Sequence, residues 1–294
     1  MVFADPKSDI AFKKIFGNEN RKEILISFLN AILDLDEGKK VIDIEILNPY
    51  QVPRIEGLKE TTLDIRAKDQ RDIHYIVEMQ VQKKVDFDKR VLYYSAKAYA
   101  GQMEKTDDYP KLNQVIFIGI CGFSIFQGKN FLTQHLILNT KTKIQELKDL
   151  EFNFIELTKF NKTEDELEDI IDQWIYFLKK APDLKIIPIN VVDKGLRSAY
   201  EVANTHKWTK REMEVFDYWL MREQDARGAI EYAKQEGIEK GIEKGIEEGI
   251  EKGIEKGKLQ TAKNLAKLGI SIDVICKATG LKKDQLKKHN KVLK

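Results

Sequence analysis

Hydrophobic residues in the first forty positions recur at spacings of three and four, the period of an amphipathic helix. The pattern extends from Phe12 to Ile32, and Gly17 is the expected break between two helices. Segment 41–47 then alternates apolar and polar residues, which predicts a strand. The chain is therefore expected to open with helices followed by a strand.

Two alternating runs farther along, 63–68 and 73–81, flank a polar turn at 69–72 and predict a β-hairpin. Residues 86–105 carry apolar side chains at helical spacing, and the near-continuous apolar run 112–120 is typical of a strand buried on both faces. The predicted order is helix, three strands, helix, strand. This order indicates an α/β fold.

The second half of the chain adds elements of both kinds to this core. Two or three further strands are expected between 131 and 157, and amphipathic helices at 164–180, 194–204 and 210–235. A Gly-Ile-Glu-Lys repeat of period four begins at Gly237. We divide the chain into four segments on this basis: a core at 1–160, a helical extension at 161–236, the repeat at 237–258 and a small unit at 259–294.

The repeat allows two interpretations. On an α-helix, each step of four residues passes a full turn by about 40°, so the Ile side chains form a slowly spiralling stripe beside a stripe of Gly. Gly inside a helix costs about 1 kcal/mol relative to Ala. The segment is either a self-associating helix, in which Gly lets a partner approach closely, or a linker that is only partly helical.

The end of the chain is basic. From Lys258 onward there are ten Lys and two Asp, whereas the whole chain carries a net charge of only +2. Short helical patterns separated by Gly269 and Gly280 resemble a small helix-turn-helix unit. Such helices also serve as protein-contact modules, so the helical C-terminal arm is expected to contact DNA or another protein.

Composition indicates the class of protein and the compartment in which we expect it. Hydrophobic residues make up 42% of the chain and charged residues 33%, as in a soluble globular protein. Cys121 and Cys276 are too few and too far apart for a disulfide framework. The first residues lack the apolar core of a signal peptide, and no run is long enough to span a membrane. We expect a cytoplasmic protein without membrane contact.

The predicted hairpin carries the residues that best suit catalysis. Asp64 lies on the polar face of the first strand, roughly opposite Val77 or Glu78, and Glu78 and Gln80 share one face of the second strand. Two carboxylates on rigid strands suit a hard divalent cation, with the carbonyl of Met79 as a third oxygen ligand. Polar residues that merely face solvent on a half-exposed strand would give the same spacing.

Other catalytic patterns are absent from the sequence. The four His residues are scattered, and no pair of Cys or His has the spacing of a zinc site. There is no phosphate-binding Gly-rich loop and no Gly-x-Ser-x-Gly motif. The hairpin therefore remains the candidate site.

Several motifs together resemble those of one family. The opening run 5–17 reads Asp-Pro-Lys-Ser-Asp-Ile-Ala-Phe-Lys-Lys-Ile-Phe-Gly, and it is followed by Leu-Asp-Ile-Arg-Ala at 63–67, Val-Glu-Met-Gln at 77–80 and Arg-Val-Leu-Tyr-Tyr at 90–94. In this order they resemble the Rpn family of recombination-promoting nucleases, also described as PD-(D/E)xK transposases. The resemblance extends to the repeat and to the closing unit.

This resemblance implies both a fold and an activity. The implied fold is a restriction-endonuclease-like core of helix, three strands, helix and strand, which would make 1–160 the nuclease core. The implied activity is Mg²⁺-dependent DNA endonuclease cleavage, linked to recombination or mobile-element activity. By position, Asp64 and Glu78 would be the metal carboxylates and Gln80 would stand where the superfamily has lysine.

A neutral Gln80 can position a water molecule but adds no positive charge. Either Gln80 suffices beside the metal, or a nearby cation such as Lys59, Arg66 or Lys83 substitutes. The wider superfamily often has an acidic residue on its first helix, and Glu23 is the candidate for it here.

The helix after the hairpin offers a surface for DNA. Arg90 and Lys97 are seven residues apart and share a helix face, with Tyr93 or Tyr94 beside them. They could hold phosphates and stack on a base, or the tyrosines could pack on the sheet. Cleavage of both strands would favour a homodimer. The alternative function is a DNA-binding or protein-interaction module that keeps the fold without cleaving.

Overall fold

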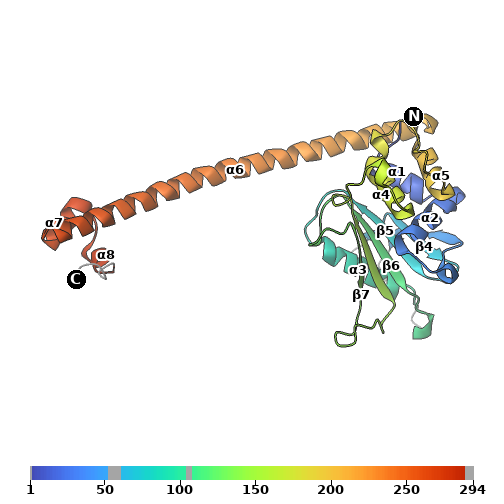
Figure 1. The fold of residues 1–294 in the computed structure, drawn as a ribbon, viewed down its shortest axis with the longest axis horizontal. Coiled ribbons are helices and arrows are strands. Elements are labelled where there is room, and N and C mark those ends of the chain that lie inside the picture. The colour runs from blue at the N-terminus through green and yellow to red at the C-terminus, as the bar shows by residue number, and fades with distance from the viewer. Residues whose placement is uncertain (1, 52–60, 104–107, 289–294) are drawn as a thin grey trace. The chain divides into compact units, whose positions relative to one another are not determined.

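The computed structural model describes residues 2–51, 61–103 and 108–288. The chain forms two compact units, Met1–Leu220 and Met221–Lys294, and Figure 1 shows their elements. This boundary differs from those expected at 160 and 236, since the helices that follow the sheet pack into the same core as the first helices. The four expected segments remain an interpretation of the chain.

The first unit is built on a six-stranded mixed sheet with the order β1-β4-β5-β6-β8-β7. The neighbours β5, β6 and β8 run parallel, and the other pairs in this sheet are antiparallel. Its strands are β1 (Ile44–Leu47), β4 (Ile65–Asp69), β5 (His74–Gln80), β6 (Val115–Cys121), β7 (Leu132–Leu136) and β8 (Leu150–Glu156). A small second sheet pairs β2 (Tyr50–Gln51) with β3 (Thr61–Thr62).

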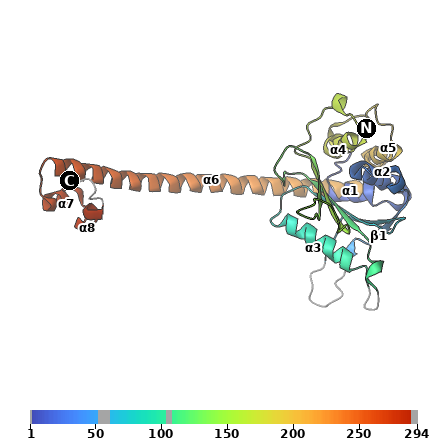
Figure 2. The same ribbon diagram turned by 60° about the horizontal axis from the view of Figure 1, so that its bottom comes forward.

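Helices cover both faces of the six-stranded sheet, as Figures 1 and 2 show. One face packs against α1 (Asp9–Phe16), α2 (Lys22–Leu33), α4 (Ile170–Lys180) and α5 (Lys194–Ala203). The other face packs against α3 (Phe87–Ala100). All seven residues of β6 are buried, as expected for a strand between two helical layers. The expected α/β class is confirmed.

Local sequence explains where the first helix begins and ends. The side chain of Ser8 accepts a hydrogen bond from the backbone N–H of Ala11 at 3.3 Å, which caps the start of α1. Gly17 is the C-cap of α1, and its backbone N–H donates to the carbonyl of Lys13 at 2.8 Å. Glycine fits this position because a Cβ would lie only 2.7 Å from the carbonyl oxygen of Lys13 and 3.1 Å from Cδ1 of Ile65. The end of α1 is thus held against the start of β4.

Helix α4, which falls within the expected helical extension, packs into the main core. Trp174 on α4 is fully buried, and its indole N–H donates to the hydroxyl of Ser27 on α2 at 3.1 Å. Its ring lies 5.8 Å from that of Phe16 on α1. Aromatic burial of this kind joins segments far apart in the sequence into one hydrophobic core.

The repeat lies within one long helix, α6 (Lys210–Lys267), which begins in the first unit. In the second unit, the end of α6 packs with α7 (Ile272–Thr279) and α8 (Lys283–Lys288) around Ala262, Ile275 and Leu281. Gly280 ends α7 in the left-handed conformation, with φ of 72°.

None of the helices in the described part of the chain is both long and apolar enough to cross a membrane.

Candidate active site

The antiparallel pairing of β4 and β5 brings the two predicted carboxylates together. Ile65 pairs with Val77, so Asp64, just before β4, lies opposite Glu78. The Asp64 carboxylate accepts a hydrogen bond from the backbone N–H of Met79 at 2.8 Å. In return, the backbone N–H of Asp64 donates to the Glu78 carboxylate at 3.1 Å. Each carboxylate is therefore fixed by the backbone of the opposite strand.

Glu78 is buried, and Asp64 is half-buried. Glu78 is only 8% exposed, and burial together with the Asp64 charge raises the pKa of Glu78 to about 8. Burial also raises the pKa of Asp64, although the hydrogen bond from Met79 opposes that rise. Two like charges held together with little solvent around them disfavour full ionisation, so this site favours a proton or a cation between them.

Helix α1 places two charged residues near this pair that the sequence interpretation missed. Lys13 lowers the pKa of both carboxyls through its positive charge, and Asp9 raises that of Asp64. Lys13 and Asp9 form an ion pair at 2.8 Å, one helical turn apart. The opening motif contains both residues at i,i+4 spacing, and this spacing is the sequence signal that could have identified them.

Gln80 is connected to α3. Its amide nitrogen donates to the carbonyl of Gln82 at 3.0 Å, and its amide oxygen accepts from the guanidinium of Arg90 at 3.5 Å. Arg90 also donates to the Tyr94 hydroxyl at 3.2 and 3.3 Å, with its guanidinium carbon 5.4 Å from the ring centre. Gln80 thus links the carboxylate-bearing strand to a cation on the neighbouring helix.

The three residues expected to contact DNA lie on α3. Tyr94, rather than Tyr93, is the tyrosine that contacts Arg90, while Tyr93 is 41% exposed and its ring lies tilted, 6.2 Å from that of Tyr94. Lys97 lies two helical turns after Arg90 on the same face and is half-buried. The structure therefore places Arg90 beside Gln80 and leaves Tyr93 toward solvent.

The three cations considered as substitutes for a lysine at position 80 differ in position and in hydrogen-bond partners. Lys59 lies outside the described residues. Arg66 donates to the carbonyl of Asn48 at 3.0 Å, and Lys83 is exposed on the segment after β5. Arg90 and Lys13, whose charges each lower the pKa of both carboxyls, are the better-supported cations at the site.

Glu23, the candidate for an acidic residue on the first helix, lies on the second helix, α2. It forms an ion pair with Arg21 at 3.5 Å, and it lines a pocket of about 860 Å³ that includes Asp193 and Gly195 at the start of α5. The acidic residue on an early helix whose charge acts on Asp64 is Asp9.

The donor set fits a hard divalent cation completed by water. Within the described residues, no group of three or more His, Cys, Asp or Glu side chains is arranged to hold a metal ion. Asp64 and Glu78 each use one carboxylate oxygen for a backbone N–H, which leaves a second oxygen on each. The N–H and C=O of one strand residue face the same edge, so the Met79 carbonyl faces the Asp64 side. Hard cations accept such oxygens and keep several waters.

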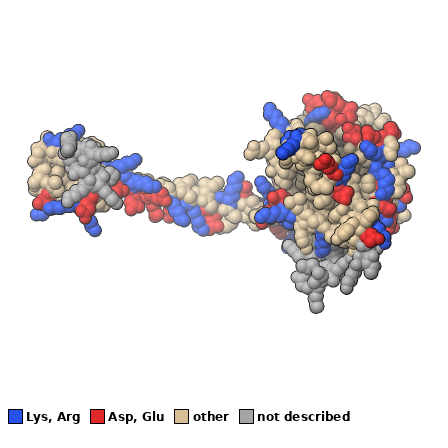
Figure 3. Space-filling view, turned by 90° about the horizontal axis from the view of Figure 1, so that it is seen from below, with Lys and Arg blue, Asp and Glu red and all other residues tan. Residues whose placement is uncertain are grey.

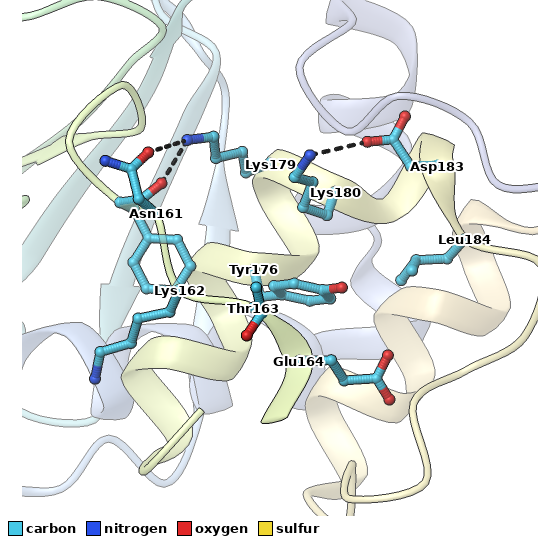
Figure 4. A pocket seen from close by; sticks show the side chains of 10 residues that line it. Asn161, Lys162, Thr163, Glu164, Tyr176, Lys179, Lys180, Asp183 and Leu184 are labelled. Atoms are coloured by element: carbon cyan, nitrogen blue, oxygen red, sulfur yellow. Dashed lines mark hydrogen bonds and ion pairs between the residues drawn. The ribbon is translucent and has the colours of Figure 1, made fainter. Parts of the chain in front are cut away.

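A second pocket, of about 460 Å³, lies beside α4 and is drawn in Figure 4. Three of its charged side chains have partners: Lys179 donates to Asn161 at 3.5 Å and to the carbonyl of Phe160, and Lys180 pairs with Asp183 at 3.3 Å. The carboxylate pair on the hairpin remains the stronger candidate for catalysis.

One comparison with known proteins found a match. A family model described as a PD-(D/E)XK nuclease family transposase matches residues 6–233, a range that holds all but the first residue of the opening motif, the carboxylate hairpin and α3. Searches of curated proteins and of solved structures each returned no match. The match confirms the resemblance seen in the motifs and ends just before the repeat. Since it covers more than half of the sequence, the chain belongs to the PD-(D/E)XK nuclease family of transposases.

Proposed function

We propose that this protein is a metal-dependent DNA endonuclease that hydrolyses backbone phosphodiesters, in the service of recombination or mobile-element activity. The observation that carries the proposal is the reciprocal bonding of Asp64 and Glu78 across β4 and β5, which holds a buried and a half-buried carboxylate side by side. A structural role alone gives no reason to hold two like charges together away from solvent.

Asp64, Glu78 and the Met79 carbonyl are the ligands we assign to Mg²⁺ or another divalent cation. When bound, such an ion lowers the pKa of a coordinated water and offsets phosphate charge. Gln80 hydrogen-bonds the attacking water through its amide. Lys13 offers its ammonium group to the negative charge that develops on the phosphoryl oxygens, a contribution that the neutral Gln80 lacks.

DNA contact is assigned to α3, with Arg90 and Lys97 on phosphates and Tyr93 stacking on an unpaired base. On the face seen in Figure 3, Lys and Arg of the first unit lie among Asp and Glu. Attraction to DNA would therefore come from local groups such as these rather than from a broad basic field. Such phosphate contacts predict binding that weakens as salt rises.

Cleavage of both DNA strands requires two active sites, and we propose that the protein acts as a homodimer. Each copy would supply one carboxylate pair. A single copy would nick one strand at a time.

The experiment is nicking of supercoiled plasmid by the purified full chain with Mg²⁺, beside the isosteric variants Asp64→Asn and Glu78→Gln. Asp72→Asn is the matched control, since Asp72 lies at the turn of the same hairpin and pairs with Lys68. We expect the wild type and the control to nick, and both site variants and an EDTA sample to be silent. Equal nicking by the site variants would refute the assignment, and DNA binding without nicking by the wild type would favour the non-cleaving module.

A further inference from the structure

Strand β4 carries a row of charged side chains that begins at the carboxylate pair. The odd-numbered residues of β4 are buried, whereas Arg66 and Lys68 between them are half-buried. Asp64, just before the strand, is half-buried as well. Because successive side chains of a strand alternate between its two faces, Asp64, Arg66 and Lys68 share one face.

The cross-strand neighbours on β5 identify this face. Arg66 pairs with Ile76, and Lys68 pairs with His74. Ile76 belongs to the hydrophobic cluster that includes Val91 of α3, whereas the buried residues of β4 pack with the helices on the opposite face. The row therefore lies on the face of the sheet that carries α3, the helix to which we assign DNA contacts.

The positive charge of the row is only partly neutralised. The Arg66 guanidinium donates to a neutral group, the carbonyl of Asn48, at 3.0 Å, and the described residues offer it no carboxylate partner. Lys68 lies between the exposed carboxylates of Glu45, at 3.4 Å, and Asp72, at 3.2 Å. A half-buried guanidinium without an acidic partner gains from an anion that arrives from solvent, and its planar fork matches a phosphate group.

The pKa of His74 indicates a positive potential beside the row. Burial lowers this pKa, and the charges of Arg66 and Lys68 lower it further. Asp72 and Asp69 raise it, but each by less than either cation lowers it. The Nδ1 atom of His74 is also buried, with no hydrogen-bond partner in the described part of the chain. This part of the face therefore favours a negative ligand.

The spacing of the row matches that of the phosphates on DNA. Side chains two residues apart on a strand are separated by about 6.7 Å. Neighbouring phosphates on one DNA strand have a similar separation, because a rise of roughly 3.4 Å per nucleotide is combined with rotation about the helix axis. One extended strand can therefore meet successive phosphates with every second side chain.

We propose that β4 binds the backbone of the DNA strand that is cut, an inference that rests on the proposed function. Asp64 lies at the phosphate to be cleaved, Arg66 binds the next phosphate, and Lys68 binds the one after it. Since the row runs in one direction from Asp64, these contacts fall on one side of the cut only. They hold the strand in register and read no base sequence.

Cleavage of DNA that carries a single neutral methylphosphonate tests this register. An end-labelled duplex is cut by the purified full chain with Mg²⁺, and the cuts around the modified position are mapped. On one side of the methylphosphonate, the wild type should cut about tenfold less at the first and second phosphodiesters than at distant ones. Arg66→Gln should lose the deficit at the first position, and Lys68→Gln the deficit at the second.

Two further variants serve as controls for charge and for location. Arg66→Lys keeps the positive charge and should keep the deficit at the first position. Lys22→Gln removes a lysine of α2 that pairs with Asp43 at 3.3 Å, on the opposite face of the sheet, and should cut like the wild type. A deficit on both sides of the methylphosphonate, or one pattern shared by the wild type and both glutamine variants of the row, would overturn the proposal.

DNA binding in EDTA tests the same contacts without cleavage. Fluorescence anisotropy across a salt series should give a slope of log Kd against log salt that is smaller by about 0.9 in Arg66→Gln and in Lys68→Gln, and unchanged in Lys22→Gln. An unchanged slope in both row variants would overturn the phosphate contacts even if the wild type cuts DNA. Binding that depends on Arg66 and Lys68 in a chain that never cuts would instead refute the endonuclease and leave the two contacts in place.

Discussion

Replacing Glu78 by Gln should stabilise the metal-free protein at alkaline pH while abolishing nuclease activity. Glu78 is nearly fully buried beside Asp64, and its pKa is raised from 4.5 to about 8. The Gln amide oxygen can still accept the hydrogen bond from the Asp64 backbone that Glu78 accepts at 3.1 Å. The substitution therefore removes a charge and keeps the shape.

The sign of this stability change follows from the linkage between proton binding and folding. The folded-state pKa of Glu78 lies above the unfolded-state value, so between pH 4.5 and about 8 the folded protein binds more protons than the unfolded chain. The free energy of unfolding should therefore fall as pH rises through this window and level off above it. The full shift corresponds to about 5 kcal/mol at 1.36 kcal/mol per unit. Relaxation and water penetration around the pair reduce the expected effect to about 2–3 kcal/mol.

Urea unfolding of wild type and Glu78→Gln from pH 5 to pH 9, in EDTA, measures this difference directly. The variant should become more stable than the wild type as pH rises, and the two curves should converge at low pH. Added Mg²⁺ should then stabilise the wild type and not the variant, because only the wild type offers both carboxylates. A difference in the free energy of unfolding that stays constant from pH 5 to pH 9 would contradict the raised pKa of Glu78.

Three further substitutions test other parts of the account. Arg90→Ala should weaken DNA binding and reduce the slope of log Kd against log salt by about 1, as measured by fluorescence anisotropy across a salt series. Gly119→Ala should lower the free energy of unfolding by about 1–3 kcal/mol in a urea titration, because its Cβ would lie 3.0 Å from the rings of Phe117 and Phe154. Tyr200→Phe should raise the free energy of unfolding by about 1 kcal/mol, since the buried hydroxyl has no hydrogen-bond partner among the described residues. A lower free energy of unfolding would contradict this expectation.

The carboxylate pair was predictable because strand periodicity is short and local. Alternation on both sides of the turn fixed the register of the hairpin to within one residue, and the structure places Asp64 opposite Glu78. The same locality explains the correct expectation of β6, a continuous apolar run that is fully buried.

Contacts between segments that are distant in the chain could not be predicted from the sequence pattern. Lys13 and Asp9 act on the pair from a helix about fifty residues earlier, and their spacing alone is that of any exposed ion pair. Trp174 joins the core of α1 and α2 because its ring packs there, which a helical pattern on α4 does not reveal. Glu23 was predicted only from its position on an early helix, and in the structure it lines the pocket beside the start of α5.

Binding of Mn²⁺, followed by electron paramagnetic resonance of the free ion, shows directly whether Asp64 and Glu78 form a cation site. We expect saturable binding to the wild type and to Asp72→Asn, and loss of that binding in both Asp64→Asn and Glu78→Gln. Equal binding by the wild type and the two site variants would contradict it.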